Sequence, residues 1–188
     1  DLFLQKNNNN EESIFAWQWT GAGTYFDGSF TNTLFAPENR LVETTYSGQI
    51  APSQDLIENG FVAGDRRRIE TFMLPGDFYP NLSYAETLDL GAPILLGYTF
   101  ELENEAHNSG AGLKKYVIGK ENLPITGKFN PQFNGESSMN TYMMRYAELL
   151  LIHAEAILGG QSGTTTDAAA LRSFNAVHNR AGLPSVTE

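Results

Sequence analysis

Two groups of aromatic residues have side chains suited to binding a sugar. Trp17 and Trp19 stand two positions apart, and Tyr79 and Tyr84 form a second group with polar residues between them. A sugar ring presents an apolar C–H face, which packs on a flat aromatic ring such as these. On a strand, Trp17 and Trp19 would share one face. These four residues are the candidate ligand-binding residues. The alternative is that they fill the core, as large aromatic side chains commonly do.

Acidic and histidine residues give little support for catalysis. The alternating glutamates of Glu101–Glu105 would share a strand face, but paired carboxylates hydrolyse glycosides only at set separations across a cleft. A solvated acidic strand is the simpler interpretation. The three histidines, His107, His153 and His178, lack the spacing of metal ligands. The sequence also has no phosphate loop, nucleophile elbow or dinucleotide fingerprint. It therefore predicts no catalytic residue, no metal site and no cofactor.

One charged run, Asp65-Arg66-Arg67-Arg68, has side chains that could bind an anion. A structural set of salt bridges between a loop and helices is the alternative, and it is the interpretation that we favour.

Composition narrows the class of protein. A length of 188 residues suits one domain with a substantial core. The formal net charge of −10 argues against a nucleic-acid-binding protein, because binding nucleic acid requires a stripe of basic residues. The simplest role of the charge is to keep the protein soluble. No run approaches the roughly 18 apolar residues of a membrane span. The sequence has no cysteine, so disulfides and thiolate metal sites are excluded.

The clearest periodicity lies in the last third of the chain. Apolar residues recur at three- and four-residue steps over 142–158. They predict a helix that starts near Asn140 or Thr141 and ends at Gly159-Gly160. Its buried stripe is predicted to contain Tyr142, Tyr146, Leu149, Leu150, His153 and Ile157.

A second helix is predicted to begin at Thr166-Asp167 and to end before Gly182 and Pro184. Two helices joined by a glycine-rich turn predict an antiparallel hairpin of the tetratricopeptide type. Such arrays usually need about three repeats for stability, and no second copy occurs upstream. We therefore expect the hairpin to pack on the preceding segment or on repeats outside this sequence.

Residues 1–140 predict an irregular, loop-rich region, since glycine and proline interrupt them repeatedly. Ser53–Ala63 is predicted to be a short helix capped by Ser53. Pro93–Leu102 is predicted to be a strand or a buried run, and Lys114–Ile118 a strand. Asn7–Asn10 is predicted to be a loop or a disordered tip. The expected fold is mainly α with irregular loops and a few short strands, in which 141–188 form a helix hairpin packed on 1–140.

The amino-acid sequences of the two predicted helices resemble the carboxy-terminal repeat of the SusD/RagB family. Arg145–Ala156 follows the pattern R-x-A-E-x-x-L-x-x-A-E-A, and Ala170–Pro184 follows A-L-x-x-[LIF]-N-x-V-R-x-R-A-G-L-P. His178 departs from it, because the family usually has arginine there. Glu11–Phe15, Gln54–Arg67 and Lys114–Tyr116 also resemble family segments, in the family's order, so the resemblance spans nearly the whole chain.

The resemblance implies a SusD-like fold and a non-catalytic lipoprotein exposed at the surface of the outer membrane. Such a protein captures oligosaccharides and passes them to a SusC-type TonB-dependent transporter. RagB-like capture of peptides is the alternative, and a glycoside hydrolase is a more distant one. An exposed aromatic shelf favours sugar, whereas a deep polar cleft favours peptide.

Full members of the family are much longer than 188 residues. We therefore expect this chain to be the carboxy-terminal part of a longer protein. The lipid anchor, and part of the family's sugar-binding aromatic residues, would lie in the missing amino-terminal part. The outer apolar face of the hairpin is then expected to be unusually exposed or covered by other polypeptide.

Overall fold

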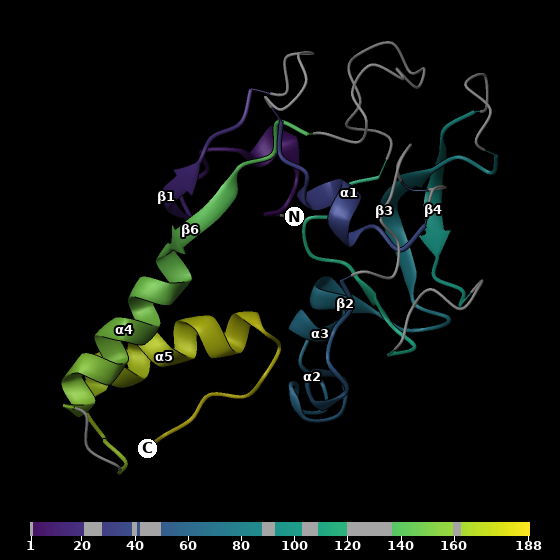
Figure 1. Ribbon diagram of the computed structural model, residues 1–188. Coiled ribbons are helices and arrows are strands. Elements are labelled where there is room, and N and C mark those ends of the chain that lie inside the picture. The colour runs from purple at the N-terminus through teal and green to yellow at the C-terminus, as the bar shows by residue number, and fades with distance from the viewer. Residues whose placement is uncertain are drawn as a thin grey trace.

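Short helices alternate with short strand pairs along the chain (Figure 1). The computed structural model describes residues 2–20, 28–38, 41, 50–87, 93–102, 109–119, 137–159 and 163–188. A 3-10 helix at Gln5–Asn7 is followed by β1 (Ser13–Trp17), α1 (Thr31–Phe35), α2 (Gln54–Asn59), α3 (Arg67–Thr71), β2 (Phe72–Met73), β3 (Phe78–Tyr84), β4 (Leu95–Thr99), β5 (Gly112–Leu113), β6 (Thr141–Arg145), α4 (Tyr146–Leu158) and α5 (Ala168–Arg180). Within this part of the chain, no helix is long and apolar enough to cross a membrane.

The described strands form three antiparallel pairs, β1–β6, β2–β5 and β3–β4. The fold therefore mixes helices with short strands, and the prediction of a mainly α fold describes only the last third. The principal core lies beside β3 and β4. Its buried residues are Ala36, Leu41, Met73, Tyr79, Leu82, Tyr98, Phe100 and Val117.

The helix pair α4–α5 is confirmed, and its termini have the predicted chemistry. Gly159 ends α4 in the left-handed conformation at φ 71°, which glycine adopts without steric cost. The Asp167 carboxylate caps α5 by accepting hydrogen bonds from the backbone N–H groups of Ala169 and Ala170 at 2.8 and 3.1 Å. His153 on α4 shares a hydrogen bond of 2.9 Å with Ser173 on α5, so the two helices are joined by a polar contact as well as by packing.

The predicted start of the first helix is wrong. Thr141–Arg145 is the strand β6, and α4 begins at Tyr146, whose backbone N–H donates to the carbonyl of Glu12 at 2.8 Å. The backbone groups of β6 pair with those of β1, which lies more than a hundred residues earlier in the chain. Local periodicity in the sequence cannot reveal so distant a partner strand. The predicted boundary at residue 140 falls directly before this strand. The division into two regions stays a prediction.

The buried stripe predicted for the first helix is also wrong. Ala147 is the buried residue of α4, whereas Tyr146, Leu149 and Ile157 are 48%, 43% and 38% exposed. The apolar residues of α4 recur at helical spacing, as predicted, but the described part of the chain packs against only one side of the helix. The exposed apolar face agrees with the expectation for part of a longer protein.

Upstream, the short helix and one of the two strands are confirmed. The Ser53 hydroxyl caps α2 by accepting from the Leu56 N–H at 3.2 Å, and β4 lies inside Pro93–Leu102. The strand predicted at Lys114–Ile118 is wrong, because the chain turns there. Tyr116 has φ 69°, and the Val117 N–H donates to the Lys114 carbonyl at 2.9 Å. Of the alternating glutamates, Glu103 and Glu105 lie outside the described residues, as does His107.

Of the two alternatives predicted for Asn7–Asn10, the structure shows an ordered turn and not a disordered tip. Asn8 donates to the Ser138 carbonyl at 2.7 Å and accepts from the Asn140 N–H at 2.9 Å. Asn9 accepts from the Asn140 amide at 3.0 Å. Short amide side chains satisfy the backbone of a distant segment here, so the run fixes the entry to β6.

Candidate functional site

The two tryptophans lie together at the end of β1. Trp17 is the last residue of the strand, pairs with Thr141 on β6, and is 59% exposed. Trp19 lies two residues beyond the strand and is half-buried, and its indole N–H donates to the Thr141 hydroxyl at 3.1 Å. Thr141 therefore positions both residues. They do not share a strand face, because β1 has ended before Trp19.

Other large apolar side chains are exposed on the same strand pair. Phe15 is 63% exposed, Ile14 47% and Met143 53%. Irregularities in the register between Ser13 and Ala16 interrupt the usual alternation of inward and outward side chains. An exposed ring needs no rearrangement to accept a ligand, so this surface is available for stacking. Trp17 therefore does not belong to the core that the described residues form, and its role in ligand binding stays a prediction.

The second aromatic group lies on another sheet and is turned inward. Tyr79 on β3 is 5% exposed, and its hydroxyl donates weakly to Asp77 Oδ2 at 3.3 Å and to the Phe72 carbonyl at 3.4 Å. Burial raises the pKa of the Tyr79 hydroxyl well above its ordinary value. Tyr84 is half-buried and packs edge-on against the core ring of Tyr98 at 5.7 Å. Tyr79 therefore cannot offer a ring face to a sugar.

The structure does not unite the four aromatic candidates. β1 and β6 form an arm on one side of the amino terminus, whereas β3 and β4 lie on the other side (Figure 1). The tryptophans form the candidate site. Tyr79 belongs to the core, and Tyr84 leans against it.

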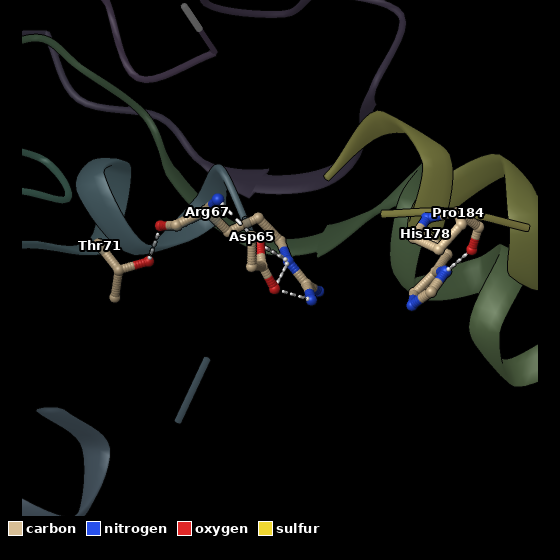
Figure 2. A network of polar contacts seen from close by, with 5 residues as sticks. All are labelled: Asp65, Arg67, Thr71, His178 and Pro184. Atoms are coloured by element: carbon tan, nitrogen blue, oxygen red, sulfur yellow. Dashed lines mark hydrogen bonds and ion pairs between the residues drawn. The ribbon is translucent and has the colours of Figure 1, made fainter. Parts of the chain in front are cut away.

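The charged run Asp65–Arg68 forms structural ion pairs, which is the interpretation that we favoured from the sequence. Asp65 is buried and accepts from the Arg67 backbone N–H at 2.9 Å and from its guanidinium at 2.6 Å (Figure 2). These hydrogen bonds lower the pKa of the Asp65 carboxyl. In the same view, His178 lies apart from this pair, near the end of α5, and its Nδ1 donates to the Pro184 carbonyl at 2.8 Å.

The next arginine of the run joins α3 to the turn before β3. Arg68 Nη2 donates to Asp77 Oδ1 at 3.0 Å, and Asp77 also accepts from the Leu74 N–H at 2.8 Å. Burial alone would raise the pKa of Asp77, but the hydrogen bonds from Arg68 and Leu74 outweigh it and the pKa is lowered. The Arg66 N–H donates to the Ala181 carbonyl at 2.8 Å, so the run also anchors the end of α5.

A cleft of about 490 Å³, which sequence reasoning missed, lies between the amino-terminal segment and these elements. The Phe3 ring lines it and packs edge-on against Tyr116 at 4.8 Å and Tyr142 at 5.8 Å. Its walls come from five segments that are far apart in the chain. The adjacent lysines of Lys114–Tyr116 were the only local signal.

The exposed Trp17, the hydrogen-bonded Trp19 and the charged cleft are features suited to a binding protein. The sequence model of the SusD family matches residues 11–188. A SusD-like protein of Bacteroides ovatus is 33% identical over 191 residues, which cover 97% of this chain and 30% of that protein. The chain therefore belongs to the SusD family, whose glycan-binding members are non-catalytic, in agreement with the expectation that it is not an enzyme.

Solved structures agree with the family. A structure determined with xylogluco-oligosaccharide is 29% identical, with a TM-score of 0.77, and matches all of this chain and 34% of its own. A laminarin-binding SusD-like protein is 25% identical, with a TM-score of 0.59, over 99% of this chain and 38% of its own. The chain spans about a third of the length of these relatives.

Proposed function

We propose that the chain is part of a surface-exposed outer-membrane protein that captures oligosaccharides for a SusC-type TonB-dependent transporter. The observation that carries the proposal is the exposed ring of Trp17 at the end of the β1–β6 pair, with Trp19 hydrogen-bonded to Thr141 two residues further along the chain. The relatives determined with xylogluco-oligosaccharide and named for laminarin binding support the same class of ligand. Lipid anchoring and the transporter partner follow from the family resemblance alone.

The geometry indicates how a sugar would bind. The apolar face of one ring packs on Trp17, which loses exposed apolar surface without any cost of opening a pocket. The Trp19 indole is fixed by Thr141, so little side-chain entropy is lost when a ligand arrives. Gln18 is exposed between them and provides amide groups for the hydroxyls at the sugar's edge.

Titration calorimetry and tryptophan fluorescence of the chain with xylogluco-oligosaccharide and with laminarihexaose test the proposal. At least one sugar is expected to bind and to change the fluorescence, because the ring that it covers is a tryptophan. Binding of neither sugar would contradict oligosaccharide capture by this part of the protein.

Peptide capture is the second candidate, and the cleft beside Phe3, which charged side chains line, is the observation that favours it. A mixture of short peptides, titrated in the same way, is expected to give no heat. Peptide binding without sugar binding would replace the proposed function by this alternative.

A further inference from the structure

The cleft beside Phe3 gathers positive charge on a chain that is acidic as a whole. The chain has a formal net charge of −10, yet the acidic residues among the described lining are Glu12 and Glu70. The cationic lining residues are Arg66, Arg67, Lys114, Lys115, Arg145 and Arg180. A concave surface with this excess of one sign attracts an anion.

Some of these charges are already satisfied. Arg67 forms its ion pair with Asp65, and Arg180 forms one with Glu12. Within the described residues, by contrast, no carboxylate lies at ion-pair distance from Lys114, Lys115 or Arg145. Glu70 acts on Lys114 only through the longer-range attraction that raises the lysine's pKa against the effect of burial. The cleft therefore contains cations with unused capacity for an anionic partner.

Lys115 and Arg145 converge on one aromatic ring. The Lys115 Nζ lies 5.2 Å from the centre of the Phe3 ring, and the Arg145 Cζ lies 5.7 Å from it. Burial lowers the pKa of Lys115, and the charge of Arg145 lowers it further. The ring offsets only part of this repulsion, since a cation–π contact contributes modestly. An anion bound in the cleft beside these cations would reduce the repulsion.

The backbone holds this arrangement in place. Tyr116 adopts φ 69° and turns the chain so that Lys115 is presented to the cleft, and the Tyr116 hydroxyl accepts from the Tyr142 N–H at 3.3 Å. Arg145 is fixed at the junction of β6 and α4. A site built on such fixed elements is preorganised for its ligand.

We propose that this cleft binds the carboxylate of an acidic oligosaccharide, with Lys115 and Arg145 as its partners. The inference rests on the proposed capture of oligosaccharides and adds a charged class of ligand to it. A guanidinium and an ammonium together can hold both oxygens of a carboxylate. A volume of about 490 Å³ is within the range of small-ligand sites.

Titration calorimetry of the chain with trigalacturonate and with its methyl ester tests this inference. The two sugars share the same backbone, and the ester replaces each charged carboxylate by a neutral methyl ester. The acid is expected to bind at least about tenfold more tightly than the ester, and added NaCl is expected to reduce the difference by screening. Lys115→Gln and Arg145→Gln are each expected to remove most of it. Lys6→Gln and Arg172→Gln, which remove exposed cations outside the cleft, are the matched controls.

The outcomes separate this inference from the proposed function. Equal affinity for acid and ester, with a neutral oligosaccharide still bound, overturns the inference and leaves oligosaccharide capture intact. Binding of an acidic peptide in place of the acidic sugar also overturns it. Absence of binding by every sugar, neutral or acidic, overturns both. Thermal melts of the variants show whether each is folded, and the comparison of acid with ester requires no variant.

Discussion

The region around β3 and β4 buries most of its aromatic rings, whereas the arm formed by β1 and β6 leaves large rings at the surface. Tyr98 and Phe100 are each 1% exposed, while Phe15 and Trp17 on the arm are more than half exposed. Both regions are rich in aromatic residues, so residue type does not distinguish a ligand surface from a core. A ring that other residues cover belongs to a core, whereas a ring that is left exposed can contact a ligand.

Large apolar side chains are exposed on the helix pair as well. Leu149, Leu151 and Ile152 on α4 and Phe174 on α5 are all exposed. The matched relatives are about three times longer than this chain. We therefore expect further polypeptide of a longer protein to pack on the helices. The difference between the two regions predicts that mutations in the region around β3 and β4 affect stability and that mutations in the arm affect binding.

The largest effect on stability is expected in the closed region. Phe100→Ala leaves a cavity in the core and should lower the free energy of unfolding by about 3–5 kcal/mol. Phe15→Ala on the arm is the matched control, with an expected change within about 0.5 kcal/mol. Urea unfolding followed by circular dichroism measures both. Equal losses would show that the arm is as closely packed as the core.

The second largest effect on stability is expected from the ion pair that joins α3 to the turn before β3. Arg68→Ala leaves the half-buried Asp77 without its cationic partner, and we expect a loss of about 1–3 kcal/mol in the free energy of unfolding. Arg172→Ala, at an exposed position on α5, is the control and should change little. A loss of the same size in both variants would mean that the pair contributes nothing specific.

Acid should destabilise the closed region through the same carboxylates. Hydrogen bonds to Arg67, and to Arg68 and Leu74, hold the pKa values of Asp65 and Asp77 below their ordinary values. A carboxyl with a lowered folded-state pKa contributes stability above its unfolded pKa of about 3.9, and that contribution is lost as the pH falls through the folded pKa. Unfolding free energies should therefore decline below about pH 4. Arg68→Ala should reduce that decline, and an identical decline in the variant would contradict the assignment to Asp77.

A smaller effect is expected at the end of α4. Gly159 has φ 71° with nothing within 4 Å of an added Cβ, so Gly159→Ala costs only backbone strain, about 1–2 kcal/mol. Gly163→Ala also meets no neighbour and has no such φ, so it is the control with no expected loss. Thermal unfolding compares the two. If the two variants melt alike, the left-handed end of α4 is not a constraint on the fold.

The elements that the sequence predicted well are those with local signals. Asp167 and Ser53 cap the helices that follow them, and Gly159 ends α4, because each acts on backbone groups within four residues. The first helix was placed too early because β6 owes its conformation to β1, which lies far away in the sequence. Tyr116 was assigned to a strand because a positive φ in a tyrosine has no sequence signature.

The candidate site could be predicted only in part. The sequence identified Trp17 and Trp19 as residues with suitable chemistry, but it gave no measure of exposure, and so it ranked Tyr79 with them. Exposure is a property of the whole fold. The cleft beside Phe3 could not be predicted at all, since Phe3, Lys115 and Arg145 come from segments that meet only in three dimensions.

The most direct test of the account is the effect of Trp17→Ala on sugar binding and on stability, measured on the same samples. We expect the dissociation constant for the bound oligosaccharide to rise at least about tenfold, while the free energy of unfolding changes by no more than about 0.5 kcal/mol. Phe78→Ala is the matched control, because Phe78 is 54% exposed on β3 and lies away from the tryptophans, so binding should be unchanged. Unchanged sugar binding by Trp17→Ala, or a loss of binding that only accompanies unfolding, would contradict the claim that the arm of β1 and β6 is the sugar-binding surface.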